Sequence, residues 1–590
     1  MPRYHVVLVT LILFLLTACS SGNNTTPVPV APVFSSTPGT QAVEGSAYTY
    51  QLAASGTAVT FSLTNAPIGA TLSGNTISWT PTAQQSRIPN SFTITATASG
   101  GASATQSWAV TPSGTIRISR TDTLWNETGS TNAPFDWSRI ASYAAALVPQ
   151  SDGSFKSFSG AADANGVFEI PNVPAGYYWL KLGPVDTYWT SSSTFDLGRD
   201  VFVPIANTTA PVTSTTHLNF SFTSLDAAAG SGQLQLDSPE LAALSYTSST
   251  NAGSTTFVGG LVINGILDLS VIKNAFVRQY EPTSFGSVDG YVLGPELTLS
   301  NLSLTTGGIN TITGALNPTV PASINLSVQG SAWAPLLDHI APTPPTYVGS
   351  GFYASVQPYI AADGPNISGS NPIDLIWTKP VNPLTLTPTL TPVLIPATCS
   401  ANPPLTTDVG PATVQYSDPF PAAWRRIFRV CQNASVAVAV PGTGKTQSIY
   451  LTNSQTTSLP TATVKPLISA VQNPKINGAD LFTASTLNSA VVTLSWDPPA
   501  IGTPFGYNVA IWSPTTLPDG TVAYFSSAML STAKTSMTLP PNVLASGQTY
   551  LFVITSLADG KANMETSPHR SSLPIANADL ISAPITTVAN

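Results

Sequence analysis

Hydrophobic and polar residues alternate with a period of two along most of this chain. Tyr48, Tyr50 and Leu52 form one such run, and Phe92 and Ile94 belong to another. Because successive side chains of a β-strand point to opposite faces of a sheet, this alternation predicts half-buried strands. Stretches rich in Gly, Pro and Asn separate the runs and are typical of turns. The pattern predicts an all-β protein made of tandem β-sandwich domains with a larger β-domain in the centre.

The N-terminus departs from this pattern. Val6 to Leu16 is apolar except for Thr10, and as a helix it would reach ~16 Å, about half of a ~30 Å hydrocarbon core. The run therefore predicts a signal peptide and not a membrane-spanning helix. The sequence LTAC, which ends at Cys19, resembles the lipobox of bacterial lipoproteins.

The lipobox resemblance implies that residues 1–18 are removed and that lipid is attached to Cys19, with palmitate as a usable label. Residues 19–32 then form an extended tether containing three prolines. In proteobacteria a serine after the lipidated cysteine, here Ser20, implies sorting to the outer membrane. We expect a cell-envelope protein that faces the periplasm or the cell surface, and the alternative is an ordinary secretory signal with a chance cysteine.

Residues 33–112 contain the motifs AVEGSAYTYQL, VTFSLTNAPIGATL, ISWTPT and SFTITATASGG. Their periodicity predicts a sandwich of about seven strands. The motifs resemble the putative-Ig, cadherin-like repeats of bacterial surface proteins. Cadherin repeats bind calcium through clustered Asp and Glu. Since this segment holds Glu44 and no aspartate, we expect no metal site in it.

Residues 113–204 contain ADANGVFEIPNVPAGYYWLKL, in which Phe168 and Ile170 share one face of a strand and Tyr178 and Leu180 share a face of the next. The stretch resembles the carboxypeptidase regulatory-like (prealbumin-like) fold, whose role is usually structural.

A polar insertion in the same segment carries three aromatic residues, Trp125, Phe135 and Trp137. Aromatic rings on a loop can stack on the faces of sugars, or they can plug the open end of a sandwich. We favour the plug and keep Trp125 and Trp137 as possible ligand contacts.

Residues 205–460 resemble no family, and their alternating runs predict a large β-rich domain. The dense apolar stretch Val258–Ile272 predicts strands that are buried on both faces.

Residues 461–590 contain VVTLSWDPPAIGTPFGYNVAIW and MTLPPNVLASGQTYLFVIT, which resemble fibronectin type III. The resemblance implies a core position for Trp496. It also implies a bond from the Tyr550 hydroxyl to an upstream backbone group.

Composition narrows the function classes. Hydrophobic residues make up 42% and charged residues 8% of the 590 residues, so cores can form. The net charge is −8, and the sequence has no basic run long enough to follow phosphates. Nucleic acid is therefore a poor candidate partner.

Cysteine usage agrees with export. Besides Cys19, the chain has only Cys399 and Cys431, an even pair for an oxidising compartment. A disulfide between them would close a loop of about 33 residues and contribute roughly 3–4 kcal/mol. Two buried free thiols are the alternative.

The densest basic cluster lies within DPFPAAWRRIFRVC, where Arg425, Arg426 and Arg429 fall close together. Trp424 and its apolar neighbours recur with helical spacing, which predicts a short helix. With Trp424, the arginines are candidates for contact with an anionic glycan or lipid headgroup. The alternative is a helix pinned to a sheet by its aromatic face.

Catalytic motifs give little support for an enzyme. AVPGTGKT, which ends at Thr446, fits the relaxed phosphate-loop pattern, but the alternating residues after it predict a strand where that site needs a helix. The chain has no G-x-S-x-G elbow. His217, His339 and His569 show no paired spacing for zinc. We expect no nucleotide, cofactor or metal.

The sequence thus predicts a lipid-anchored, exported, non-enzymatic scaffold or adhesin of the cell surface. It would be attached to the membrane through Cys19, with an extracellular polysaccharide or another surface protein as a partner. A glycan-binding surface lipoprotein is the alternative, and an enzyme with its active site in residues 205–460 is a third, less favoured hypothesis.

Overall fold

The computed structural model describes residues 30–588 except for 127–128, 184–185, 203–214, 228–229, 231, 238–244, 265–268, 274, 286–287, 344–351, 360–375, 379–407, 419–424 and 489–490. The predicted signal peptide, Cys19, most of the tether, Cys399 and Trp424 therefore lie outside the described residues.

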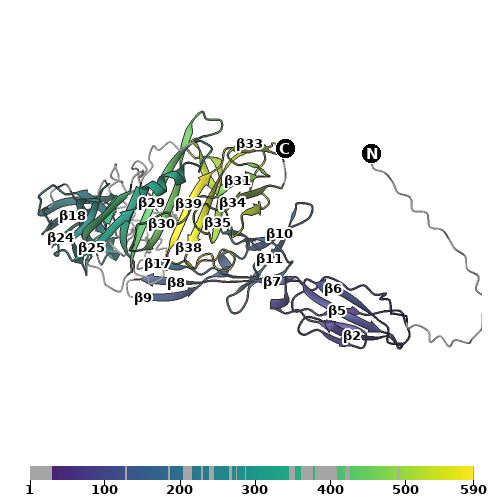
Figure 1. The fold of residues 1–590 in the computed structure, drawn as a ribbon. Helices are drawn as coiled ribbons and strands as arrows, with labels where there is room; N and C mark the ends of the chain where they lie inside the picture. The colour runs from purple at the N-terminus through teal and green to yellow at the C-terminus, as the bar shows by residue number, and fades with distance from the viewer. Residues whose placement is uncertain are drawn as a thin grey trace, which may run out of the picture. The chain divides into compact units, whose positions relative to one another are not determined.

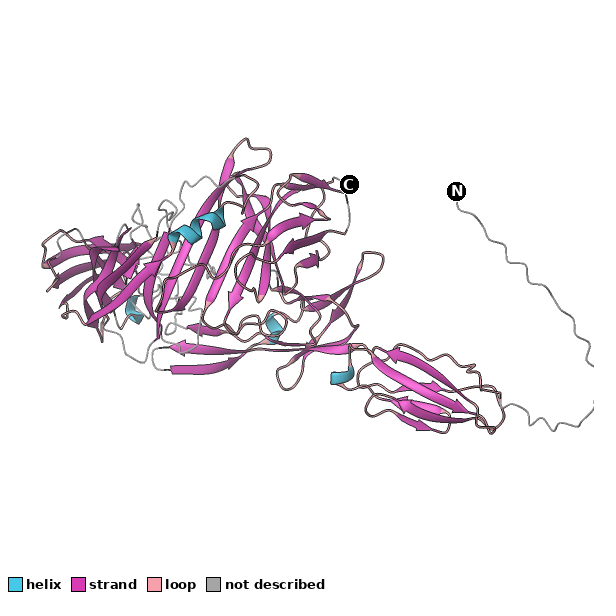
Figure 2. Cartoon of the chain, in the orientation of Figure 1, coloured by secondary structure: helices cyan, strands magenta, loops and turns pink. Residues whose placement is uncertain are grey.

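Nearly all regular structure in the described ranges is β-strand (Figure 2). The only α-helix in these ranges is α1, Gly330–Trp333, and short 3₁₀ turns occupy Ala83–Gln85, Trp137–Arg139, Leu269–Val271 and Ala334–Leu337. None of the helices in the part of the chain that the structure describes has the length and apolar character needed to cross a membrane. The predicted all-β fold is confirmed.

The chain divides into two compact units, one ending at Ser113 and one beginning at Gly114. In the first unit, two three-stranded sheets, β1-β4-β3 and β2-β5-β6, form the layers of a sandwich. The strands are β1 Tyr48–Gln51, β2 Thr60–Asn65, β3 Thr71–Ser73, β4 Thr76–Trp79, β5 Asn90–Thr97 and β6 Ser103–Val110.

Aromatic rings fill the space between these two sheets. Trp79 and Phe92 are buried and meet edge to face, with ring centroids 5.5 Å apart. Trp108 stacks on Phe92 from the next strand at 5.1 Å. Tyr48 and Tyr50, from the alternating run, point into this core. The period-two pattern therefore placed the core of this unit correctly.

The second unit begins with the 114–204 module. Its strands are β7 Gly114–Ser119, β8 Thr121–Asn126, β9 Gly129–Pro134, β10 Ala145–Pro149, β11 Phe155–Ser159, β12 Ala161–Ala162, β13 Phe168–Val173, β14 Tyr178–Lys181, β15 Thr187–Thr190, β16 Thr194–Asp196 and β17 Asp200–Phe202. Sheet β12-β13-β7-β16 packs through Phe168 and Ile170 on Tyr178 and Leu180, as the alternation predicts.

The central part of this unit is also built from strands. They are β18 Thr215–Thr223, β19 Gln233–Asp237, β20 Ser245–Ser249, β21 Thr256–Asn264, β22 Ala275–Phe285, β23 Val288–Leu299, β24 Ile309–Ala315, β25 Pro321–Val328, β26 Phe352–Tyr359, β27 Ile376–Thr378, β28 Val409–Ser417, β29 Arg425–Ala439 and β30 Thr446–Ser458.

The C-terminal module, residues 461–588, completes the unit (Figure 1). Its strands are β31 Gln472–Ile476, β32 Ala479–Asp480, β33 Ser485–Leu487, β34 Thr493–Asp497, β35 Gly506–Thr516, β36 Val522–Thr532, β37 Ser536–Thr538, β38 Thr549–Asp559, β39 Ile575–Ile581 and β40 Ile585–Thr587. Strands of all three parts join one sheet of 18 strands; β30 pairs with β39, and β15 with β36.

Two features implied by the fibronectin resemblance are present. Trp496 is 4% exposed and contacts Tyr507 edge to face at 5.2 Å. The hydroxyl of Tyr550 accepts a hydrogen bond of 2.6 Å from the backbone N–H of Ala545.

The predicted helix around the arginine cluster is wrong. Residues Arg425–Ala439 form strand β29, which pairs with β26 on one side and β30 on the other. Ile427, Phe428 and Val430 are all buried, so both faces of the strand lie against packed layers. A strand buried on both faces has apolar residues at consecutive positions, and these can mimic the helical period.

The prediction of burial on both faces is wrong for β21, the described strand of the Val258–Ile272 stretch. Phe257 is buried, but Val258 is 80% exposed and Val262 is 54% exposed. Among the residues that the structure describes, one packed core, which includes Leu218 and Phe220, lies against this sheet. The apolar density of the sequence therefore reflects an uncovered face and not a second core.

Candidate functional site

The loop between β38 and β39, residues 560–574, contacts the 114–204 module. Asp559 orders its base, because Oδ1 accepts backbone N–H bonds from Lys561 and Ala562 at 2.8 Å and from Ser572 at 2.9 Å. Aspartate commonly orders loops in this way, since its carboxylate replaces backbone acceptors. The β38–β39 loop therefore has internal support for its conformation.

Arg570 joins this loop to the 114–204 module. Its guanidinium donates to Asp196 Oδ2 at 2.8 Å and Oδ1 at 3.1 Å, and Nη2 also donates to the Thr121 carbonyl at 3.0 Å. A Cβ atom on Gly198 would lie 2.3 Å from the backbone carbonyl oxygen of Thr121 and 2.0 Å from Arg570 Nη2, so the close approach requires glycine. Bidentate arginine–carboxylate pairs fix orientation as well as distance.

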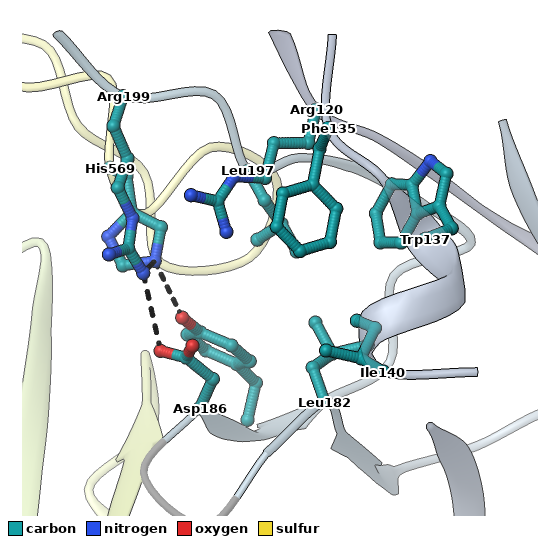
Figure 3. A pocket seen from close by; sticks show the side chains of 10 residues that line it. Arg120, Phe135, Trp137, Ile140, Leu182, Asp186, Leu197, Arg199 and His569 are labelled. Carbon is teal, nitrogen blue, oxygen red and sulfur yellow. Dashed lines mark hydrogen bonds and ion pairs between the residues drawn. The ribbon is translucent and has the colours of Figure 1, made fainter. Parts of the chain in front are cut away.

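His569 lies at the centre of a second group of contacts. Its Nε2 is 2.8 Å from the Tyr188 hydroxyl and 3.3 Å from Arg199 Nη2, and Arg199 Nη2 is 3.5 Å from Asp186 Oδ1 (Figure 3). Because a guanidinium can only donate, this geometry requires Nε2 to accept and the imidazole to be neutral. We call His569, Tyr188, Arg199, Asp186 and Arg120 the His569 cluster.

The electrostatics of the cluster agree with that protonation state. Burial, and then the positive charges of Arg199 and Arg120, lower the pKa of His569 to about 3. Burial also raises the pKa of Tyr188 far above its ordinary value, so its hydroxyl stays protonated and donates. At neutral pH the cluster is therefore a fixed set of hydrogen bonds, with its histidine uncharged.

The cluster borders a cavity of about 30 Å³. Figure 3 shows Arg199, His569 and Asp186 on one side of this space and apolar side chains on the other. A cavity needs about 10–15 Å³ to hold one water molecule, so this one has room for very little more. It is too small for a sugar or nucleotide.

Backbone pairing and a buried tryptophan reinforce the same interface. Tyr188 and Trp189 in β15 pair in parallel with Ser531 and Thr532 in β36. Trp179 is fully buried in a hydrophobic core that the C-terminal module shares with strands β29 and β30 of the central part. Its indole N–H donates to the Thr538 carbonyl at 2.8 Å.

A larger groove of about 390 Å³ lies beside the β10–β11 hairpin. Its volume is in the range of ligand sites. It is lined by Gly153, Ser154, Phe155, Leu487, Asn488, Val491, Val492, Thr538, Leu539, Pro540, Pro541, Asn542, Leu544, Ala545, Ser546, Thr587 and Val588. None of these side chains titrates, so the lining offers no general acid or base.

One pair of carboxylates in the central part has unusual electrostatics. Burial, together with the neighbouring carboxylate of Asp226, raises the pKa of Glu281 to about 7. Two carboxylates that share a proton can perform acid–base chemistry. Neither residue lines the cavity beside His569 or the larger groove. No group of three or more metal-ligating side chains occurs in the described part of the chain.

The structure places the aromatic candidates inside the 114–204 module. Trp137 is 4% exposed, and its indole N–H donates to the Gly166 carbonyl at 2.8 Å. Phe135 meets it edge to face at 5.0 Å. Trp125 belongs to β8, and its side chain lies outside the description. For Trp137 the geometry matches the plug and leaves almost no ring surface for a sugar.

Of the arginine candidates, the structure describes the side chains of Arg426 and Arg429, which lie three positions apart and therefore on opposite faces of β29. Arg426 makes a bidentate pair with Asp418, at 2.6 and 2.7 Å, and both side chains are largely buried. Arg429 is half-buried on the same strand. In the sheet its backbone lies opposite Ser355 of β26 and Thr456 of β30. The side chains of Arg425 and Cys431 lie outside the description. Arg426 is therefore neutralised by a partner.

The segment AVPGTGKT is the turn of the β29–β30 hairpin, as predicted. Ala439 pairs with Thr446, and a strand follows. The Val440, Thr443 and Lys445 backbone N–H groups all donate within the turn. These three groups are used within the turn, and a strand follows where a phosphate loop needs the N-terminus of a helix.

We expect Lys445→Ala to leave stability within about 0.5 kcal/mol of wild type, because the residue is an exposed turn position. Titration calorimetry with ATP and Mg²⁺ should show no heat of binding for either protein. A micromolar dissociation constant that is lost in the variant would contradict the turn interpretation.

Sequence reasoning missed the main contacts between the modules. His569 was noted only as an isolated histidine, and Arg570, Asp196 and Arg199 were not singled out. Residues 370 or more positions apart form these pairs, so no local spacing could reveal them. Trp179 gave a weak signal, because it interrupts the alternation between Tyr178 and Leu180 with a large apolar side chain.

Comparison with known families identifies one part of the chain. Residues 31–113 match the family model described as Putative Ig domain. The match confirms the Ig-like interpretation of the first unit. No curated protein matches the chain.

Three solved structures show a weak likeness. One is titled "Structural insight into host cell surface retention of a 1.5-MDa bacterial ice-binding adhesin" (12% identity, 65% of this chain and 100% of that chain, TM-score 0.13). Another is surface layer protein SbsC, domains 4–9 (11% identity, 95% of this chain and 83% of that chain, TM-score 0.10). The third is a tetra-tandem repeat in the extending region of a large adhesion protein (12% identity, 88% of this chain and 98% of that chain, TM-score 0.10). At such TM-scores the strand arrangements do not superpose, and no function follows.

Proposed function

We propose that this protein is a lipid-anchored, non-enzymatic scaffold of the bacterial cell surface, of the adhesin kind. The observation that carries the proposal is the interlocking of the 114–204 module with the C-terminal module. The His569 cluster and the Arg570–Asp196 pair use their polar groups to bind one another. Such contacts suit a rigid extension more than a catalytic centre, where polar groups must remain available to a substrate.

Export and anchoring are supported by the sequence. The short apolar run and LTAC at Cys19 are typical of a lipoprotein signal. The Ig-like match of residues 31–113 adds a module that recurs in extended proteins. In this proposal Cys19 holds the chain in the outer membrane, and the β-modules extend from it.

Anchoring is tested by labelling with palmitate in a Gram-negative host. Wild type should incorporate the label and sediment with membranes, whereas Cys19→Ala should remain unprocessed and unlabelled, since it lacks the thiol that carries the lipid. Wild type that takes up no palmitate would refute the anchor.

Surface exposure is tested on intact cells with a membrane-impermeant maleimide and Tyr450→Cys, because Tyr450 is 60% exposed.

A further inference from the structure

The outward face of sheet β21-β18-β24 is an uncovered β-surface. Val258 is 80%, Val262 54% and Ile309 75% exposed, while the opposite face packs on Leu218 and Phe220. Figure 1 shows β18 and β24 at the end of the second unit that lies away from β31 and β34. Large apolar side chains exposed on one face of a sheet and rimmed by polar residues can mark an interaction site.

The register of the three strands places nine outward residues in a regular grid. In the first row Val262, His217 and Ile309 lie side by side. The second row is Gly260, Asn219 and Thr311, and the third is Val258, Ser221 and Thr313. We call these nine residues the β18 face. None is Asp, Glu, Lys, Arg, Phe, Tyr or Trp.

This composition discriminates between partners. A sugar-binding surface typically stacks the rings of Trp, Tyr or Phe on the sugar, and the β18 face has none of these three residues. A partner selected by charge would need opposite charges to pair with. Two copies of a chain with net charge −8 repel one another, and they approach most easily through a surface that has no acidic residue.

The face is also complementary to itself. Consider a two-fold axis that runs along β18 between two stacked copies, so that β21 of each copy lies over β24 of the other. Val262 then lies over Ile309 of the second copy, and Gly260 lies over Thr311. His217 meets its own equivalent on the axis. Such isologous contacts are the commonest way in which identical chains pair.

We propose that the β18 face binds a second copy of this chain, face to face, as a weak homophilic contact. Three strands ~4.8 Å apart and seven residues at ~3.4 Å each cover about 340 Å² per copy. The total of ~700 Å² is well below the ~1,200 Å² of a stable interface, so the contact requires high local concentration. Such pairing would add a homophilic contact to the proposed scaffold function. It rests on that function in one respect, because anchoring to the membrane provides the high local concentration of chains that a weak contact needs.

The first test is a chemical cross-link between the two copies of position 217, which lie on the two-fold axis. His217→Cys in the full chain, purified in detergent at high concentration, is treated with a short bis-maleimide. Tyr450→Cys is the matched control, because Tyr450 is exposed on β30 outside the face. We expect at least a tenfold excess of dimer for His217→Cys. Peptide mapping should show the peptide around position 217 linked to itself, which separates this product from links through native cysteines.

The second test uses charge. Val262→Lys or Ile309→Lys, placed in the His217→Cys background, should abolish the cross-link, because each puts two lysines into the paired face. Tyr450→Lys in the same background should leave it unchanged. All three positions are exposed, so folding should survive, and circular dichroism verifies it.

Two outcomes would overturn the proposal. One is a His217→Cys cross-link no stronger than that of Tyr450→Cys. The other is loss of binding to an added polysaccharide in Val262→Lys without any dimer, which would assign the face to a glycan. Both measurements work in detergent, so they are independent of whether Cys19 carries lipid.

Discussion

Trp179→Ala should lower the free energy of unfolding of the second unit by about 3–5 kcal/mol. This is the usual cost of replacing a buried tryptophan by alanine, because the cavity left behind is only partly refilled. Trp179 is fully buried, packs in the core that the C-terminal module shares with β29 and β30, and donates to the Thr538 carbonyl. The substitution therefore removes packing and a hydrogen bond across the interface between the modules.

Trp179→Ala should also change the shape of the thermal unfolding transition. Calorimetry of wild type is expected to show the 114–204 and C-terminal modules unfolding together, and Trp179→Ala should separate them. Trp137→Ala is the control, because Trp137 is also buried but has its ring contacts, Phe135 and Phe168, within the 114–204 module. It should destabilise the 114–204 module without uncoupling the two. Equal behaviour of both variants would contradict a coupling role for Trp179.

The second large effect is a dependence of stability on pH that His569 causes. Its pKa is about 3 in the folded protein and 6.5 as the ordinary value, so the unfolded chain binds the proton more readily between these limits. The stabilisation that comes from an uncharged His569 is then fully present well above pH 6.5 and falls as the pH drops toward 3, by at most about 1.4 kcal/mol per pH unit. Between pH 7.5 and pH 5 we expect this contribution of His569, taken by itself, to fall by about 2 kcal/mol.

His569→Gln isolates this contribution. Its amide oxygen can accept from Tyr188 or Arg199, but the side chain does not titrate. Burial raises the pKa of Asp579 to about 6 and of Glu281 to about 7, and these groups have the opposite effect on stability as pH falls. Both are present in wild type and variant, so they cancel in the difference measured by urea denaturation.

The exposed His339 supplies the control for that measurement. His339→Gln should keep the pH dependence of wild type. If His569→Gln also keeps it, the histidine is protonated without cost in the folded state. The contacts with Tyr188 and Arg199 would then not be the ones that stabilise the interface.

Local patterns predicted the strands that border one core well. Tyr48 and Tyr50 in the first unit, and Phe168 and Ile170 in the second, lie where the alternation placed them, because one face meets a core and the other meets solvent. The turn at AVPGTGKT was also predictable. Glycines with positive φ, Gly442 and Gly444, and a following alternating strand are both local signals.

The same reasoning failed where burial did not follow one face. β29 is covered on both sides, and its consecutive apolar residues imitated a helix. β21 has an apolar outer face, and its composition imitated a doubly buried strand. Periodicity reports how hydrophobic residues are spaced, but it does not report how many layers cover them.

The sequence by itself determined the all-β class, the Ig-like first unit and the hairpin turns, because these depend on residues close together in the chain. Only the tertiary structure decided that the β38–β39 loop reaches the 114–204 module and that Arg570 meets Asp196. It also decided that Val262, His217 and Ile309 share one row. Each of these contacts joins residues 45 or more positions apart. Only the folded sheets bring such residues together, and no spacing along the chain encodes which distant strands become neighbours.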